Sequence, residues 1–494
     1  MSKAALRQIK NSFNFLVPPR GDSHVKGHQT KSLPESTNDS GISIWSEKSE
    51  EEEEEEAPLP SPGDNMLKRI LTKKMTMSFS ASAVVQRKDT TEEPNSTAQA
   101  RIEDIKNGKH IHKSIKPATR LMKYTSITEM KSNDVVSLIQ NNYRRNEEGY
   151  LEMVNSEISQ KQKEVAGKIA KQLGSAIFSK KGISLPLSIF EPHSMLEKVA
   201  LNFIYAPNFL DPAGTETDPL EQFKLVLTFW VASLHTNVWL YKPFNPILGE
   251  TFQGYIEENP VYLEQVSHHP PVCCYQMVAE DYQIAGRYEA QASSSTNGLK
   301  TKSFGFPKVT FKNTNASIVA FMPTFSVNGT MFGKKTYHLS QKLVLVDFEN
   351  QYYTEIDFES EGGGFWGGNK KQGKDAFSSA IYKVNTSFLQ KLKKEMQGNK
   401  DLGSKFKPKD DSVEKLDDIE GSWLTHLSIG NIRYWNFGSD MPAQLNKLHN
   451  PLPSDTTYRP DVLYLKVNDE KMAQKQKEML EEVQRKDKKL REKK

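Results

Sequence analysis

The most constraining feature of the sequence is a series of short β-branched and aromatic runs within residues 246–384, separated by glycine, asparagine and proline. Such runs are typical of strands, and the residues between them are typical of turns. Because no helical segment separates the runs, they indicate an antiparallel sheet or barrel rather than alternating strands and helices. The predicted strands are residues 251–256, 261–266, 285–290, 309–311, 317–321, 342–348 and 352–358.

Helical patterns flank this β region. Apolar residues recur four apart from Val165 to Ile177, which predicts an amphipathic helix of about four turns that ends before Pro186. Residues 220–240 are dense in aromatic and aliphatic side chains, which suits a buried helix. Residues 469–494 are highly charged and predict a long, solvated terminal helix.

The N-terminal part of the chain has a different composition. Residues 17–145 are rich in serine, threonine, lysine and glutamate and include seven consecutive glutamates at 50–56. Such a segment buries too little apolar area to offset its chain entropy. We therefore predict that residues 1–145 are mostly disordered, with order beginning near Val135, and that residues 146–494 form one folded domain. The basic first 16 residues leave an organelle presequence, an interfacial helix or a frayed tail open.

Charge and cysteine content exclude several classes of protein. The 66 basic and 62 acidic residues leave a net charge of +4, which argues against a nucleic-acid partner. The two cysteines, Cys273 and Cys274, are neighbours, so neither a disulfide framework nor a four-ligand zinc site is available. The longest apolar stretch, residues 226–234, is shorter than the roughly 20 residues of a membrane-spanning helix. We expect a cytosolic protein, peripheral on intracellular membranes.

Nucleotide and catalytic motifs are not supported by their context. Residues 362–367 match G-x-G-x-x-G and residues 368–374 nearly match a P-loop, but Asp375 stands where magnesium binding requires serine or threonine. No motif of a hydrolase or metalloenzyme is present. We therefore expect no cofactor, no metal, no catalytic residue and no enzymatic activity.

A pair of histidines stands out at the end of one predicted strand. Residues 264–271 read Glu-Gln-Val-Ser-His-His-Pro-Pro. The two prolines fix the backbone and prevent further strand pairing, so His268 and His269 are rigid donors suited to an anion. The alternative is a turn in which backbone carbonyls satisfy both imidazoles.

This block resembles the signature of the oxysterol-binding protein-related family, and the resemblance extends over residues 165–493. Residues 242–250, Lys-Pro-Phe-Asn-Pro-Ile-Leu-Gly-Glu, are similar to the family's K-P-x-N-P-x-L-G-E block. Residues 187–196 resemble the segment after the family's lid, and residues 434–437 and 452–461 resemble its closing region.

The resemblance implies a fold of mainly β structure with α-helices. It consists of a large antiparallel β-barrel around a lipid tunnel, with an N-terminal helical lid at about residues 165–186 and a C-terminal helix. It further implies extraction of single lipids and exchange of a sterol for phosphatidylinositol 4-phosphate between membranes, through transient peripheral contact. The family's headgroup site, at the tunnel mouth, falls on Lys242, Asn245, His268, His269, Lys477, Glu481 and Arg485.

The spacing of the last three residues supports a shared site. Lys477, Glu481 and Arg485 are four residues apart, so each is rotated by only about 40° from the previous one and all share a helix face. Lys242 supplies a point charge for a polyanionic headgroup, and Arg485 a planar fork. The alternative is a solvated ion-pair ladder that contributes little stability.

Two departures from the family pattern leave the tunnel ligand open. The closing motif lacks its first arginine at Thr457, and residues 302–305 read Lys-Ser-Phe-Gly where the family has K-F-W-G. Sterol, phosphatidylserine and other lipids remain candidate cargos, and protein partners are unassigned. A lipid sensor or scaffold without net transport is an alternative function, as is a lipid-modifying enzyme with His268 as its base.

Overall fold

The structure is a computed structural model of the chain, and it describes residues 133–176, 186–268, 270–294, 297–330, 333–359, 373–398 and 413–491. All of these belong to one of the two compact units of the chain. The first described element is α4 (Asn133–Asn142), which begins close to the predicted onset of order at Val135. The disorder predicted before it, the acidic run and residues 362–372 of the two glycine-rich motifs lie outside the described residues.

Eighteen strands in the described ranges form one antiparallel sheet, which confirms the predicted strand class. Each of the seven predicted runs coincides with a strand, although several strands extend beyond the predicted limits. The strands are β1 (Tyr143–Arg145), β2 (Leu151–Met153), β5 (Thr251–Ile256), β6 (Asn259–His268), β7 (Pro271–Val278), β8 (Tyr282–Ser294), β9 (Gly298–Phe304), β10 (Lys308–Phe311), β11 (Ser317–Phe321), β12 (Thr324–Asn328), β13 (Thr336–Ser340), β14 (Lys342–Asp347), β15 (Tyr352–Asp357), β16 (Ala376–Val384), β17 (Val413–Ser422), β18 (His426–Ile429), β19 (Ile432–Asn436) and β20 (Leu445–Lys447).

The sheet forks at its longest strand. The first part of β8 pairs with β10 and its last part pairs with β9, so two branches leave the same strand. One branch continues through β12, β13 and β2 to β1, and the other runs through β11 and β14 to β19. On the other side of β8, the sheet ends at β20. Within the described ranges no ladder joins β1, β19 and β20, so the strands form an open sheet rather than the predicted closed barrel.

The β1–β2 hairpin bridges the two branches without strand pairing. The backbone amide of Lys374 donates to the Glu148 carbonyl at 2.7 Å. Arg145 forms an ion pair with Asp375 at 2.8 Å, just before β16. Asp375 also accepts from the Ser422 hydroxyl at the end of β17. Side chains and single backbone contacts therefore connect the branches where a barrel would need a continuous ladder.

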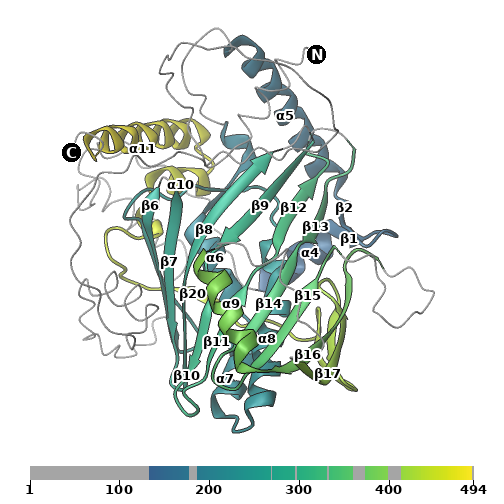
Figure 1. The fold of residues 1–494 in the computed structure, drawn as a ribbon. Coiled ribbons are helices and arrows are strands. Elements are labelled where there is room, and N and C mark those ends of the chain that lie inside the picture. Colours follow the sequence, from purple (N-terminus) through teal and green to yellow (C-terminus); the bar gives the residue numbers. More distant parts are fainter. Residues whose placement is uncertain are drawn as a thin grey trace, which may run out of the picture. The chain divides into compact units, whose positions relative to one another are not determined.

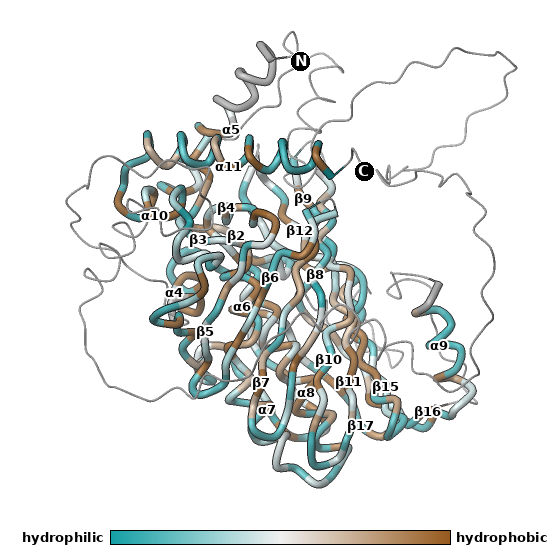
Figure 2. The backbone as a smooth tube through the Cα atoms, turned by 90° about the vertical axis from the view of Figure 1, so that its left-hand side faces the viewer, coloured by the Kyte–Doolittle hydropathy of each residue, from teal (hydrophilic) through white to brown (hydrophobic). Residues whose placement is uncertain are grey.

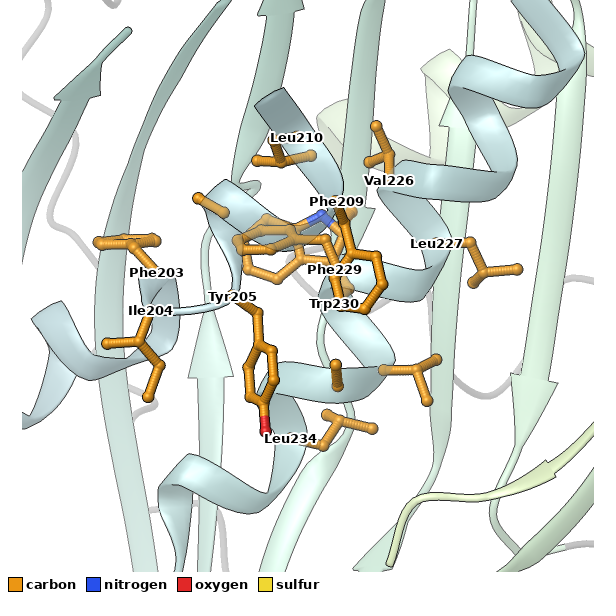
Figure 3. Close-up of a cluster of buried hydrophobic side chains, with 14 of the residues drawn as sticks. Phe203, Ile204, Tyr205, Phe209, Leu210, Val226, Leu227, Phe229, Trp230 and Leu234 are labelled. Atoms are coloured by element: carbon orange, nitrogen blue, oxygen red, sulfur yellow. The ribbon is translucent and has the colours of Figure 1, made fainter. Parts of the chain in front are cut away.

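Three helices supply much of the hydrophobic core. α6 (Met195–Ala200), α7 (Ala206–Thr215) and α8 (Pro219–Ser233) contribute aromatic and aliphatic side chains that pack with inward-facing strand residues. Figure 3 shows Tyr205, Phe209 and Trp230 gathered in this cluster. The Asp218 side chain accepts from the Leu220 amide and caps α8. The predicted buried helix is confirmed, but it ends at Ser233 and continues as a 3-10 turn, η3 (Leu234–Asn237).

The remaining helices include two at one end of the sheet that position the site. α10 (Pro460–Lys466) and α11 (Glu470–Arg491) lie against each other there, with α5 (Ser156–Ala176) also at that end (Figure 1). α11 confirms the predicted terminal helix, and hydrophilic and hydrophobic residues alternate along it (Figure 2). α9 (Thr386–Gly398) follows β16. Among the described helices, none is long and apolar enough to cross a membrane.

The helix of the predicted lid begins earlier than expected, at Ser156 rather than Val165. The Asn155 side chain accepts from the Ile158 amide at 3.1 Å, and Glu157 provides an acidic first turn, so these polar residues start the helix. The spacing of apolar residues does not indicate a helix start that is formed by polar residues. Residues 177–185 of the lid lie outside the described ranges.

Candidate anion-binding site

The first half of the candidate site stands on a short parallel strand pair. β4 (Lys242–Phe244) runs beside β3 (Phe190–Ser194), which follows a 3-10 turn, η1 (Leu187–Ile189). The Lys242 ammonium donates to the Asn245 side-chain oxygen at 2.6 Å and to the Pro243 carbonyl at 3.0 Å. Lys242 and Asn245, which the sequence motif put in one site, are therefore in direct contact.

The second half of the site lies on α11. Lys477 pairs with Glu481 at 2.7 Å, and Arg485 approaches the same carboxylate at 3.8 Å. The exposed fraction of the side chains increases along the helix, from 6% at Lys477 to 35% at Glu481 and 62% at Arg485. The structure thus places these three residues in one row that leads from the interior to solvent.

An aromatic ring that the sequence analysis did not assign links the two halves. The Lys242 ammonium lies 4.9 Å from the centroid of the Phe190 ring, and the Lys477 ammonium lies 5.3 Å from it. Phe190 packs in turn on Phe244, with ring centroids 4.9 Å apart. Phe190 lies in the motif of residues 187–196, but no local sequence pattern indicates that its ring contacts lysines about 50 and 290 residues away.

The charge of Lys242 is sensitive to its surroundings. Burial lowers the pKa of its ammonium group to about 7, and the positive charges of Lys477 and Arg459 add to this effect. Glu481 on α11 and Glu191 on β3 oppose it. A bound anion would favour the charged form, so this site gains positive charge when an anion enters.

A buried ion network fixes the loop that carries Asn245. The Arg459 guanidinium binds both carboxylate oxygens of Asp461, at 2.8 and 2.9 Å, and the Glu250 carboxylate at 2.8 Å. It also donates to the Asn245 carbonyl at 2.7 Å. The Ser194 hydroxyl donates to the other oxygen of Glu250. This network joins β3, the loop after β4 and the start of α10.

The carboxylates of this network keep their arginine charged. Burial alone would lower the pKa of Arg459, but Asp461 and Glu250 raise it above its ordinary value. Burial raises the pKa of Glu250 against the opposing effect of Arg459. Both Arg459 and Glu250 stand in sequence motifs noted above, but no local pattern indicates that they meet across the fold.

His268 ends β6, where it lies opposite Pro271 of β7. The loop after β4 is tied to this strand, because the Gly249 amide donates to the Gln265 carbonyl at 2.9 Å and the Gln265 amide donates to the Glu250 carbonyl at 2.9 Å. Backbone hydrogen bonds therefore connect β6, which ends at His268, to the loop that carries Asn245. His269 lies outside the described residues.

The chemistry of this arrangement is that of anion binding. The site contains the ammonium groups of Lys242 and Lys477, the guanidinium of Arg485 and the side-chain amide of Asn245. The carboxylates of Glu481 and Glu191 orient these groups or balance their charge. In the described part of the chain, no group of histidine, cysteine, aspartate and glutamate side chains is arranged to hold a metal ion. Burial raises the pKa of the Cys273 thiol, which disfavours the reactive thiolate.

Comparison with known proteins gives one consistent result. The family model described as oxysterol-binding protein matches residues 168–494. The chain is 30% identical over 339 residues to oxysterol-binding protein 9 of Dictyostelium discoideum, covering 67% of this chain and 76% of that relative. It is 31% identical over 186 residues to oxysterol-binding protein-related protein 5 of Mus musculus, covering 36% of this chain but only 21% of the mouse protein.

A solved structure is also similar. The crystal structure of the Osh3 ORD in complex with PI(4)P from Saccharomyces cerevisiae has a TM-score of 0.48 and 19% sequence identity, covering 66% of this chain and 84% of that one.

Proposed function

We propose that this chain, which belongs to the oxysterol-binding protein family, binds single membrane lipids and transfers them between membranes. We infer a sterol as one cargo and phosphatidylinositol 4-phosphate as the exchanged one. The protein acts without catalytic residues or cofactors and touches membranes transiently from the cytosol. Phosphatidylserine is a further candidate cargo.

The observation that carries the proposal is that the ammonium groups of Lys242 and Lys477 lie 4.9 and 5.3 Å from the centroid of the same ring, that of Phe190. A phosphomonoester carries a charge of about −1.5 to −2 near pH 7, so it matches a site with two adjacent ammonium groups. Asn245 contacts one of these lysines, and Arg485 extends the positive row toward solvent. His268 and His269 complete the proposed headgroup site.

Hydrophobic burial can supply the driving force for extraction. A lipid tail of roughly a dozen methylenes, at about 0.8 kcal/mol each, gains roughly 10 kcal/mol on leaving water, so a protein cavity can compete with a bilayer for one lipid. We assign α5 to the lid that covers this cavity. Its Gln162 side chain donates to the Leu240 carbonyl, which tethers the first turns of the helix two residues before Lys242 in the chain.

The test is extraction of phosphatidylinositol 4-phosphate from phosphatidylcholine vesicles by the purified full chain. We expect Lys477→Met and the double variant His268→Ala, His269→Ala to lose at least about tenfold in extraction, because each removes charged or donor groups from the headgroup site. Lys486→Met is the matched control, since Lys486 is on the same helix and pairs with Glu482 at the surface. Unchanged extraction by folded site variants would refute the headgroup assignment.

A second candidate function is a sensor or scaffold that binds lipid without net transport. Transfer from donor to acceptor vesicles separates the two functions. Exchange of sterol against phosphatidylinositol 4-phosphate at a rate above the spontaneous one supports the proposed transfer. Tight binding with negligible transfer would favour the sensor.

A further inference from the structure

Phe190 contacts two cations that come from distant parts of the chain. The Lys242 and Lys477 ammonium groups lie 4.9 and 5.3 Å from the centroid of its ring. Both distances are within the roughly 6 Å at which an aromatic face attracts a cation. An aliphatic side chain of similar size would fill the same space but would not attract either charge.

An aromatic face near Lys242 favours its charged form, which burial and the positive charge of Lys477 disfavour. Lys477 is almost fully buried, and its positive charge acts on Lys242, whose own ammonium group is also removed from water. Burial and like charge both favour the neutral form of a lysine. The Asn245 side chain and the Pro243 carbonyl accept from Lys242, and neither carries a charge to balance an ammonium group, whereas the Glu481 carboxylate accepts from Lys477.

The ring is itself held in place. Phe190 belongs to a buried cluster with Leu187, Phe244, Val462 and Ala473, which come from η1, β4, α10 and α11. The electron-rich ring is therefore fixed before any ligand binds, and it costs no reorganisation when the lysines meet it. A preorganised site binds more tightly than one that must assemble around its ligand.

We propose that Phe190 is a positioning residue that holds Lys242 and Lys477 together as a charged pair, and that this pair selects lipids with a phosphomonoester headgroup over lipids with a phosphodiester alone. The inference rests on the proposed function. A phosphomonoester carries up to two negative charges and uses both cations, whereas a phosphodiester carries one. Loss of the paired arrangement therefore weakens the first class of lipid more than the second.

The experiment replaces Phe190 in the full chain by phenylalanine analogues with one, three and five ring fluorines. Fluorination withdraws charge from the ring face with little change in shape, so it separates the electrostatic role from packing. Affinity is measured with phosphatidylcholine vesicles that contain either phosphatidylinositol 4-phosphate or phosphatidylinositol. We expect the first affinity to fall stepwise, by roughly tenfold at five fluorines, and the second to change less than about twofold.

Matched controls keep packing and folding separate from this effect. Phe377 receives the same analogues, because its ring packs on Phe358 with centroids 5.7 Å apart, and we expect no change in affinity. Phe190→Tyr keeps the ring and should keep selectivity, whereas Phe190→Leu should lose it. Thermal unfolding verifies that each variant is folded.

The outcomes separate the two proposals. If Lys242→Met leaves binding of phosphatidylinositol 4-phosphate unchanged, the proposed headgroup site is wrong. If Lys242→Met weakens it while fluorination at Phe190 does not, the headgroup site stands and the role of Phe190 is wrong. In the last experiment, inorganic phosphate competes with the vesicles at the same concentration as their phosphatidylinositol 4-phosphate. Release of the protein from the vesicles would assign the lysine pair to free phosphate and overturn the proposed selectivity for a lipid.

Discussion

Two arginines of the site illustrate how the surroundings of a residue set its role. Arg459 is buried and binds Asp461 and Glu250, whereas Arg485 is mostly exposed and lies 3.8 Å from Glu481. Removing one partner from a buried ion network leaves an uncompensated charge away from water. Removing an exposed partner costs little, because water screens the remaining charge. The sequence alone assigned a role only to Arg485.

We therefore expect Arg459→Met to reduce the free energy of unfolding by about 3–5 kcal/mol, because Asp461 and Glu250 would remain buried without their cation. Arg485→Met should change it by less than about 1 kcal/mol. Urea unfolding of both variants, followed by circular dichroism, measures the difference. Equal losses in the two variants would contradict a structural role for the Arg459 network.

At the scale of elements, the β1–β2 hairpin connects two branches of an open sheet. Its turn approaches Lys374 and Asp375 so closely that a Cβ atom on Gly149 would lie 2.3 Å from the Lys374 amide nitrogen. Gly149 also has a φ of +85°, a conformation that glycine adopts readily and other residues avoid. The hairpin therefore needs glycine for its conformation and for the close approach.

We expect Gly149→Ala to open this contact and to destabilise the protein by at least about 1 kcal/mol more than Gly333→Ala. Gly333 is the matched control, because it has a φ of +76° but a Cβ atom there meets no described atom within 4 Å. Hydrogen exchange of residues 143–153 measures the opening. Similar protection in both variants would show that the hairpin contact does not depend on this close approach.

At the scale of the whole molecule, buried histidines link stability to pH. Burial lowers the pKa of His193 and of His235 to about 3, below the usual value of 6.5. His235 stacks on Trp435 and meets the Tyr205 hydroxyl at 3.3 Å, so its ring is fully enclosed. Between pH 6.5 and 3 the unfolded chain binds protons that the folded chain does not, and stability is therefore lost as the pH falls.

We expect the free energy of unfolding to decrease from pH 7 to pH 5.5, with each histidine contributing up to about 1.4 kcal/mol per pH unit. His235→Phe should reduce this slope, because it removes one titrating group. Tyr205→Phe should retain it, because the imidazole remains. Denaturant unfolding at several pH values provides the measurement, and an unchanged slope in His235→Phe would exclude His235 as a source of the pH dependence.

The sequence by itself determined the features that depend on local pattern. The β-branched and aromatic runs between turn residues predicted seven strands, the charged last stretch predicted α11, and the spacing of Lys477, Glu481 and Arg485 put them on one helix face. These predictions succeeded because strand and helix periods are properties of neighbouring residues. Polar capping residues fall outside the apolar period, and this is why the predicted start of α5 was late.

Only the tertiary structure decided which distant residues meet. The fork at β8 and the open ends at β1, β19 and β20 depend on pairing between strands far apart in the chain. The strand pattern, which fitted a sheet or a barrel, and the family resemblance, which implied a barrel, therefore could not establish closure. The same applies to Phe190 between two lysines and to Arg459 between Glu250 and Asp461. Burial and electrostatic attraction act through space, and local periodicity carries no record of which partners the fold brings together.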